Sequence, residues 1–391
     1  MVGSRTSAIE RKISQAKADE ELLYLLLDLL SRSFSPGIQS LHKCRGVGEF
    51  DKRVIVACAY NILRYVDTIE DSSLWVEDKV RLHDSVALVI DKIARRGKEE
   101  NIDDLIFSMG IITYRLKEAV RNEQERIFVE HFGRGVVLRK LHSFDAGVKD
   151  DINYCTLRMT EGMKDFLHRG EIETTQQLRD YCFSVAGSIG EFLTSLVNSK
   201  DSAILQDREL DAGLAQRFGE LLQLTNIAKN VREDADARRV FFPVVYRPSK
   251  MTHLDLIYGI GDDVVDARKQ SLDSVLTLAK DNLEDSVKYV TSIPAGLSGY
   301  KAFCIIPFVT AIKTIETMEN AGAERVFVGD ETAIKIRHGE NIIKFCGRLA
   351  MNYGGVNAND WLLEYAQNHA AFSFEHERYT RWSHEWLEKI R

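Results

Sequence analysis

The sequence predicts an all-α protein, and three observations support this fold class. Apolar residues recur every three to four positions over most of the 391 residues, as on the buried face of a helix. Only five prolines occur, which suits long helices. The β-prone signal is confined to a short piece at residues 325–328, followed by a Gly329-Asp330 turn.

The expected helices follow in order along the chain. The first covers residues 7–31, where the segment ELLYLLLDLL carries apolar residues at helical spacing, and the second covers 52–70, with VIVACAYNILRYVDTIE as its body. Further helices are expected over 76–95, 101–120, 122–131, 138–169, 175–197, 207–232, 262–293, 299–321 and 332–353, with a last one from 359 to 373.

The chain is interpreted as a single all-helical domain over residues 1–391. It contains no linker rich in Pro, Gly or Ser and no low-complexity segment. The first ~13 and the last ~25 residues are expected to be peripheral to this domain. A chain that is 45% hydrophobic is ample for a large core.

Composition also excludes several classes of protein. A net charge of −7 gives no electrostatic footprint for nucleic acid. Six cysteines without CxxC spacing predict neither a zinc site nor a disulfide framework, so a reducing, cytoplasmic location is expected. The apolar runs are too short or too interrupted to span a bilayer, and no signal peptide or membrane anchor is expected. The oligomeric state is left open.

Two acidic motifs repeat one pattern far apart in the sequence. Asp67, Glu70 and Asp71 fall at positions i, i+3 and i+4, and so do Asn230, Glu233 and Asp234, which places each set on one helix face. Two such helices facing each other would crowd their carboxylates around one cavity, which requires cations between them. We therefore predict Mg²⁺, with three ions expected, and a diphosphate as the anion that the ions bind.

The first motif is preceded by polar residues on the same face. Tyr60, Arg64, Asp67 and Asp71 are spaced by four, three and four positions. Arg64 can bind phosphate oxygens while Asp67 and Asp71 hold the metal. The alternative is a solvated surface face, which the apolar run before the motif disfavours.

The second motif continues a polar stripe along an otherwise apolar helix. Gln223, Asn226, Asn230, Glu233 and Asp234 form this stripe. Burying amides is costly unless they bind something, and their oxygens can ligate a hard cation. Lys229 and Arg239 flank the stripe and could neutralise phosphate. The alternative is a hydrogen-bonded amide network in the core.

Longer segments resemble the squalene/phytoene synthase family, and its squalene synthase branch most closely. They include LSRSFSPGIQSL, YNILRYVDTIED, YCFSVAGSIGEFL, LLQLTNIAKNVREDADARRVFFP, FCIIPFVTAI and AIKIRHGE, in this order over roughly residues 14–357. The resemblance implies the isoprenoid synthase fold, Mg²⁺ and farnesyl diphosphate as substrate. It implies diphosphate or substrate contacts from Ser31, Arg32, Tyr60, Arg64, Gln223, Lys229, Arg239 and Phe303. It implies metal ligation by Asp67, Asp71, Asn226 and Asp234.

Three positions depart from the family pattern. Asn230 stands where the family's second motif opens with Asp, and Lys229 stands where the family usually has Arg. Ser184 occupies the position of a catalytic Tyr in squalene synthases, which puts head-to-head condensation in doubt. Lys335 and Arg337 resemble part of the NADPH phosphate site, but in relatives without NADPH such residues can contact diphosphate, and an exposed basic helix end is an equal alternative.

Three functions are therefore carried forward. We expect a class I terpene synthase that cyclises farnesyl diphosphate to a humulene-type sesquiterpene, as squalene-synthase-like humulene synthases of fungi do. The alternative is squalene synthase chemistry, which joins two farnesyl diphosphates with NADPH. A non-catalytic binding or assembly protein derived from the family ranks last, because the acidic stripes are largely kept.

Overall fold

The protein is described here by a computed structural model. It describes residues 11–13, 15–16, 18–30, 37–38, 41, 51–95, 101–120, 122–206, 208–247, 251–329 and 362. Within these residues the regular structure is helical, and the one extended pairing is an isolated bridge between Glu171 and Val240. The all-α prediction is thus confirmed.

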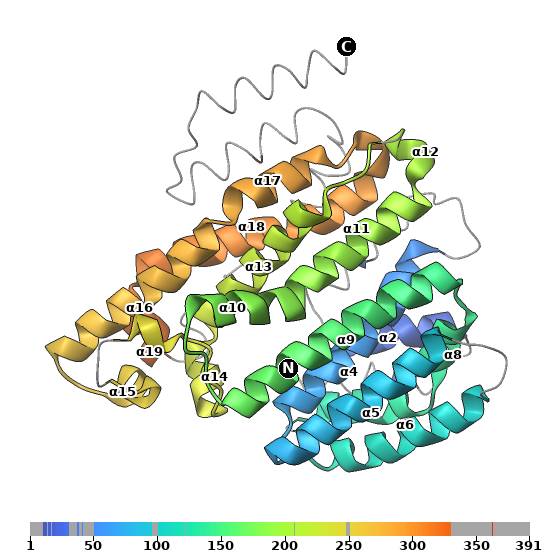
Figure 1. The fold of residues 1–391 in the computed structure, drawn as a ribbon, viewed down its shortest axis with the longest axis horizontal. Helices are drawn as coiled ribbons and strands as arrows, with labels where there is room; N and C mark the ends of the chain where they lie inside the picture. Colours follow the sequence, from blue (N-terminus) through green and yellow to red (C-terminus); the bar gives the residue numbers. More distant parts are fainter. Residues whose placement is uncertain are drawn as a thin grey trace.

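Helix α9 runs between two groups of helices (Figure 1). The first group precedes it in the chain and consists of α2 (Asp19–Leu30), α4 (Lys52–Asp71), α5 (Val76–Ala94), α6 (Ile102–Lys117), α7 (Glu123–Gly133) and α8 (Val136–Ser143). Helix α9 itself covers Ala146–Arg169. It packs on α4 and α5 on one side and on α11 on the other.

The second group follows α9 along the chain. It consists of α10 (Thr175–Cys182), the π-turn η2 (Phe183–Gly187), α11 (Ser188–Lys200), α12 (Ser202–Leu205), α13 (Ala212–Lys229), α14 (Val231–Asp236), α15 (His253–Tyr258), α16 (Asp262–Lys280), α17 (Leu283–Ser292), α18 (Ser298–Ala321) and α19 (Ala323–Val328). Two 3-10 turns, η3 (Val244–Tyr246) and η4 (Ala295–Leu297), lie between these helices.

Capping residues explain where several helices begin. The Asp51 side chain accepts a hydrogen bond from Arg53 N at the start of α4, and Asp145 accepts one from Val148 N at the start of α9. Thr174 and Gln177 form a capping box on α10. Asp145 also explains why the predicted helix over 138–169 is in fact two helices, α8 and α9.

Other sequence predictions were wrong in detail. The predicted helix over 262–293 is divided into α16 and α17, and the predicted helix over 175–197 contains the π-turn η2. The β-prone piece at 325–328 is helical and belongs to α19, where Phe327 is fully buried with its ring edge-on to Phe242. The predicted helices over 332–353 and 359–373 lie outside the described residues.

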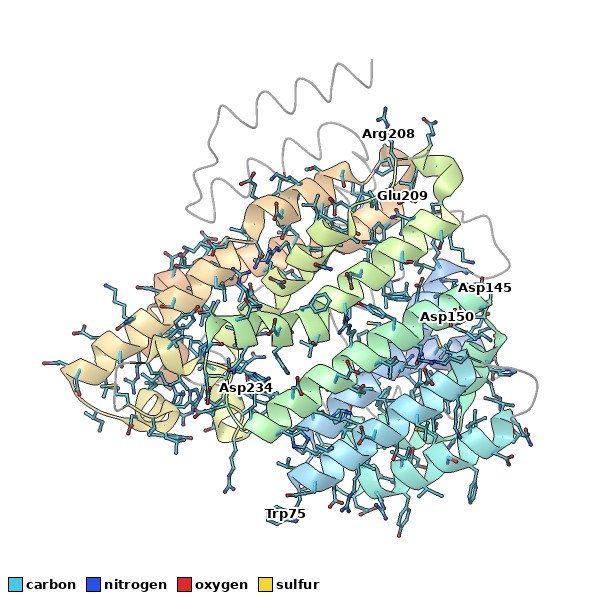
Figure 2. All side chains as sticks on the ribbon, in the orientation of Figure 1. Trp75, Asp145, Asp150, Arg208, Glu209 and Asp234 are labelled. Carbon is cyan, nitrogen blue, oxygen red and sulfur yellow. The ribbon has the colours of Figure 1, made fainter. Side chains whose placement is uncertain are left out.

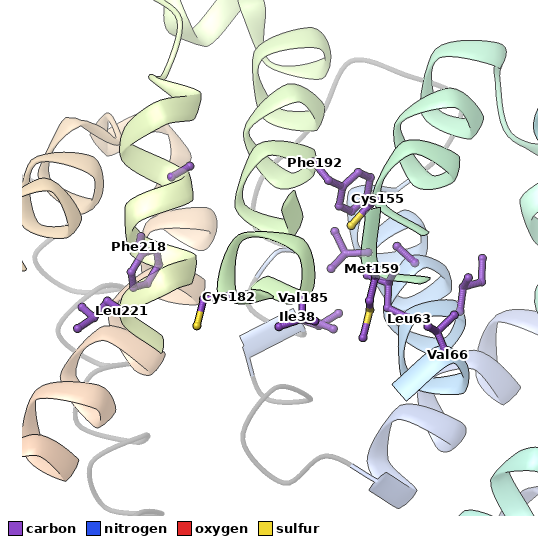
Figure 3. Packing of buried hydrophobic residues seen from close by; sticks show 14 of the residues in the cluster. Ile38, Leu63, Val66, Cys155, Met159, Cys182, Val185, Phe192, Phe218 and Leu221 are labelled. Carbon is purple, nitrogen blue, oxygen red and sulfur yellow. The ribbon is translucent and has the colours of Figure 1, made fainter. Parts of the chain in front are cut away.

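The core is one cluster that joins the two helix groups (Figure 3). Phe218 and Leu221 of α13 lie on one side of Val185 in the π-turn, and Leu63 of α4 and Met159 of α9 lie on the other. The cluster continues through both groups, so the helices that carry the two acidic motifs are fixed by the same packed interior.

Two glycines allow α13 to approach the segment of η2 and α11 closely. A Cβ atom on Gly190 would lie 2.3 Å from the Ala215 carbonyl oxygen, and one on Gly219 would lie 2.4 Å from that of Ala186. Any larger residue at either position would therefore push the helices apart. This close crossing fixes the position of α13, whose C-terminal end leads into the second acidic motif.

Helix α18 is the most apolar long element of the described residues. Together with the preceding turn, Ala295–Ala321 is long enough to cross a membrane and contains an 18-residue window with a mean hydropathy of 1.4. However, 72% of this window is buried by the rest of the protein. This is the environment of a core helix, and it includes Lys301, whose Nζ donates to the Ile293 carbonyl at 3.0 Å.

Candidate active site

The first acidic motif occupies the last turns of the continuous helix α4. Tyr60, Arg64, Asp67 and Asp71 are all half-buried on one face, in agreement with their spacing. The Arg64 guanidinium donates from Nη1 to Asp67, and the same nitrogen lies 3.9 Å from Asp71 Oδ2. The positive charge of Arg64 thus lies beside the carboxylates of Asp67 and Asp71.

The second motif is interrupted at Asn230. Helix α13 ends at Lys229 and α14 begins at Val231, with Asn230 between them at φ −97° and ψ 10°. Backbone hydrogen bonds from Asn230 N to Asn226 O and from Asp234 N to Asn230 O, at 2.9 and 2.8 Å, continue the helical i to i+4 spacing across this break. Asp234 therefore stays on the same face as Asn226 and Asn230, as the spacing predicts.

Arg239 brings the two motifs together. Its Nη1 donates to Asp71 Oδ1 of the first motif, and its Nη2 donates to Asp234 Oδ1 of the second at 2.8 Å. Arg239 Nε lies 3.2 Å from the same Asp234 oxygen. Figure 2 shows Asp234 on the short helix α14. Two aspartates from distant parts of the chain therefore contact one guanidinium.

Burial changes the ionisation of this cluster. It raises the pKa of Asp67 to about 6, against the opposing effect of Arg64 and with a further rise from Asp71. Burial also raises the pKa of Asp234 to about 6, opposed by Arg239. A bound cation would stabilise these carboxylates, because a nearby positive charge favours their ionised form.

Glu70 has different surroundings from the two aspartates of its motif. It is 4% exposed, and its two carboxylate oxygens lie 3.1 and 3.3 Å from the hydroxyl group of Tyr181. The Tyr181 ring packs against Phe166 and Phe241, with centroids at 5.4 and 4.9 Å. Burial, together with Asp71, raises the pKa of Glu70 to about 8.

The structure places the other predicted residues less centrally. Asn226, Lys229 and Glu233 are exposed, and Gln223 is half-buried on α13. The Asn230 amide group donates to Asn226 Oδ1 at 3.2 Å. Ser31, Arg32, Lys335 and Arg337 lie outside the described residues.

Two predicted pocket residues are part of packed contacts. Phe303 is 5% exposed on α18, where its ring stacks on Tyr300 at 6.2 Å and faces Gly37. Ser184 is half-buried in the π-turn and donates to the Asp180 carbonyl at 2.9 Å. A Cβ on Gly162 of α9 would lie 2.3 Å from Ser184 Cβ, so these two positions are in direct contact.

Two residues of the cluster are absent from the sequence prediction. Glu125 of α7 lies with Oε1 3.2 Å from Arg64 Nη2, and Tyr181 contacts Glu70 as described. Tyr181 opens the segment YCFSVAGSIGEFL, which the resemblance already singled out, so a signal existed for it. Glu125 lies in an ordinary amphipathic helix, and nothing in its spacing connects it with Arg64.

The chemistry of the donors fits Mg²⁺. Asp67, Asp71 and Asp234 supply carboxylate oxygens, and Asn226 and Asn230 supply amide oxygens, which are the ligands that a hard cation prefers. Within the described part of the chain, no group of three or more His, Cys, Asp or Glu side chains is placed to hold a metal ion. Arg64 contacts Asp67, and Arg239 contacts Asp71 and Asp234, so a bound ion would have to replace these hydrogen bonds.

The fold and its relatives define the class of protein. The arrangement is that of the all-helical isoprenoid synthases: it superposes with a TM-score of 0.60 on a solved complex of TcSQS with the ligand BPH1237, at 23% identity, covering 90% of this chain and 98% of that one. A dehydrosqualene synthase complex gives a TM-score of 0.50 at 16% identity, covering 87% of this chain and 99% of that one. At these identities the likeness shows the fold.

The sequence comparisons identify the family. The profile described as squalene/phytoene synthase matches residues 49–338, so the chain belongs to that family and is an isoprenoid synthase enzyme. It is 27% identical to Squalene synthase clz20 of Cochliobolus lunatus, over 78% of this chain and 68% of that protein. It is 28% identical to Squalene synthase 1 of Arabidopsis thaliana, over 81% and 68%. The match to the Probable squalene synthase of Neurospora crassa, at 28%, spans 58% of that protein.

Proposed function

We propose that this protein is a Mg²⁺-dependent enzyme that ionises farnesyl diphosphate. The observation that carries the proposal is the shared guanidinium: Asp71 and Asp234, one from each acidic motif, both contact Arg239. Carboxylates that converge in this way on a half-buried cationic group are suited to hold metal ions against a diphosphate. Membership of the squalene/phytoene synthase family supports the same chemistry.

The residues divide into metal ligands and side chains that donate hydrogen bonds to the diphosphate. Asp67, Asp71 and Asp234, with Asn226 and Asn230, would hold the ions. When bound, Mg²⁺ supplies positive charge that stabilises the departing diphosphate. Arg64 and Arg239 donate hydrogen bonds to the phosphate oxygens, and Lys229 stays a prediction for the same role. Ser31 and Arg32 stay predictions for the same role. Glu70, which contacts Tyr181, and Glu233 stay predictions as further ligands.

The relatives favour head-to-head condensation as the reaction that follows formation of the allylic cation. In this reaction, two farnesyl diphosphates join with loss of one diphosphate and one proton to give presqualene diphosphate. A hydride from NADPH then accompanies loss of the second diphosphate and gives a C30 hydrocarbon. The relatives described above are named squalene synthases, and they match about four fifths of this chain. Lys335 and Arg337 stay candidates for the NADPH phosphate.

Cyclisation of a single farnesyl diphosphate is the second candidate, and Ser184 favours it. Ser184 stands where the resemblance places a catalytic tyrosine, and its hydroxyl group donates to a backbone carbonyl of its own helix. This position therefore supplies no phenol to the reaction. In the cyclase reaction, the distal double bond attacks the cation, and loss of diphosphate and one proton gives a humulene-type C15 hydrocarbon.

One experiment separates these two fates. The purified protein is incubated with Mg²⁺ and farnesyl diphosphate, with and without NADPH, and the products are identified by gas chromatography and mass spectrometry. We expect a C30 product that requires NADPH. A C15 hydrocarbon whose yield does not depend on NADPH would establish the cyclase instead, and consumption of no substrate in either mixture would overturn both.

A further inference from the structure

The guanidinium group of Arg64 is contacted from two different helices. On the α4 side, Nη1 donates to Asp67 and lies 3.9 Å from Asp71 Oδ2. On the opposite side, Nη2 donates to Glu125 Oε1 of α7 at 3.2 Å. Arg64 Nε is buried, and among the described residues it has no hydrogen-bond acceptor. The two Nη groups therefore contact different helices, and the buried Nε–H has no acceptor among the described residues.

Glu125 is fixed in place by its own helix and by the contact of α7 with α4. It lies in the first turn of α7, where its backbone N–H donates to the Asn122 side chain at 2.9 Å, and it is 8% exposed. The residue next to Arg64, Tyr65, stacks on Phe132 of α7 with ring centroids 4.2 Å apart. The Tyr65 hydroxyl also lies 3.0 Å from Thr113 Oγ1. Helix α7 is thus anchored immediately beside Arg64.

We infer that Glu125 is a positioning residue that orients Arg64 toward the diphosphate, an inference that rests on the proposed function. If Asp67 and Asp71 held a metal ion, they would be less available to Arg64 Nη1 as hydrogen-bond partners. The Nη2 contact with Glu125 comes from an element outside both motifs and is independent of the metal. It keeps one edge of the planar guanidinium fixed while Nη1 and Nε face the phosphate oxygens.

A purely electrostatic role for Glu125 predicts the opposite sign. A carboxylate close to a diphosphate repels it, so removing the charge alone would strengthen diphosphate binding. A positioning role predicts that truncation weakens binding, because the guanidinium loses its orientation. Glu125→Gln distinguishes these roles further, because glutamine keeps an oxygen acceptor for Arg64 Nη2 and removes the charge.

The test is a double-mutant cycle read by calorimetric titration of inorganic diphosphate in the presence of Mg²⁺. The proteins are the wild type, Glu125→Ala, Glu125→Gln, Arg64→Lys and Arg64→Lys combined with Glu125→Ala. We expect Glu125→Ala to weaken binding about tenfold and Glu125→Gln by less than about threefold. In the Arg64→Lys background, Glu125→Ala should change binding by less than about twofold, because the planar group that it positions is gone.

Several outcomes would overturn the inference. Tighter binding by both Glu125 variants would show that the carboxylate only repels the ligand. Equal losses in the two Arg64 backgrounds would show that Glu125 does not act through Arg64. If Glu125→Ala does not fold, a loss in Glu125→Gln as large as tenfold would still exclude positioning by hydrogen bonding. Failure of the wild type to bind diphosphate would instead overturn the proposed function, and this inference with it.

Discussion

The motifs at residues 67–71 and 230–234 have equivalent positions in very different surroundings. Their last residues, Asp71 and Asp234, share Arg239. Their glutamates differ, because Glu70 is buried against Tyr181 and Glu233 is exposed. The first residues differ as well: Asp67 contacts Arg64 within a continuous helix, whereas Asn230 lies at the break between α13 and α14.

This comparison separates the positions of the pattern by their surroundings. The final aspartate has the same surroundings in both motifs, because both copies contact Arg239. The preceding glutamate is buried against Tyr181 in the first motif and exposed in the second. Similar spacing therefore does not imply equal roles for all acidic residues, and each position of the pattern can be tested against its counterpart.

The largest effect is expected at the shared position. Asp71→Ala should lower turnover of farnesyl diphosphate at least about a hundredfold, equivalent to about 2.7 kcal/mol of barrier, because it removes a metal ligand and leaves Arg239 without one of its two partners. Asp67→Ala should behave similarly. Diphosphate release at saturating Mg²⁺ measures the loss. Full wild-type activity in excess EDTA would refute a role for metal.

Asp234 and Glu233 form a matched pair within the second motif. Asp234→Ala should lower kcat/KM about tenfold, or about 1.4 kcal/mol, since the side chain is 12% exposed and binds Arg239. Glu233→Ala removes an exposed carboxylate and should change kcat/KM less than about twofold. Steady-state rates with farnesyl diphosphate test both variants. Similar losses in the two would mean that Glu233 also acts in the site.

Glu70 should make the metal-free protein less stable as the pH rises. Its pKa is about 8 in the folded chain against an ordinary value of 4.5, so the folded state binds more protons between these values. The free energy of unfolding therefore falls from about pH 4.5 to pH 8. Glu70→Gln cannot ionise and still accepts from Tyr181, so at pH 8 it should be more stable than the wild type by roughly 4 kcal/mol, as a pKa rise of this size implies.

Denaturant unfolding at several pH values, in EDTA, measures this difference. Glu233→Gln is the matched control, and its pH dependence should follow the wild type because Glu233 is exposed. If the Glu70→Gln curve were parallel to that of the wild type over this range, the buried position of Glu70 would not govern the pH dependence.

The smallest effect is expected at Asn230, where the two motifs differ in residue type. Asn230→Asp introduces the carboxylate that the first motif has at Asp67. The Mg²⁺ concentration for half-maximal rate should fall about threefold, because a carboxylate binds a hard cation better than an amide does. Rates measured over a series of Mg²⁺ concentrations give this value. An unchanged value would place Asn230 outside the set of ligands.

The sequence predicted the first motif better than the second for physical reasons. Helix α4 was expected over 52–70 and covers Lys52–Asp71, because Asp51 caps its start and a long apolar run follows. The break at Asn230 has no comparable signal, since helical backbone hydrogen bonds continue on both sides of it. The sequence nevertheless predicted correctly that Asn226, Asn230 and Asp234 lie on one common face.

Local sequence patterns could not predict contacts between helices that are far apart in the sequence. Glu125 reaches Arg64 only because α7 packs on Tyr65, and no spacing within the sequence indicates this. The error at 325–328 has a similar origin. Val326, Phe327 and Val328 have high β-propensity, but tertiary packing places Phe327 beside Phe242 within a helix.

The π-turn at Phe183–Gly187 has a consequence for changes in chain length. In this turn the Ser188 N–H bonds to the Phe183 carbonyl, five residues earlier, so the turn holds one residue more than an α-helical turn. The wide turn absorbs this extra residue, so the helical segments before and after it keep nearly the facing that an α-helix one residue shorter would give them. Deleting one residue here would therefore close the turn into a regular α-helix and leave Gly190 near Ala215. The same deletion within the regular helix α13 would rotate the residues after it by roughly 100°, so changes in chain length should be better tolerated in the π-turn than in α13.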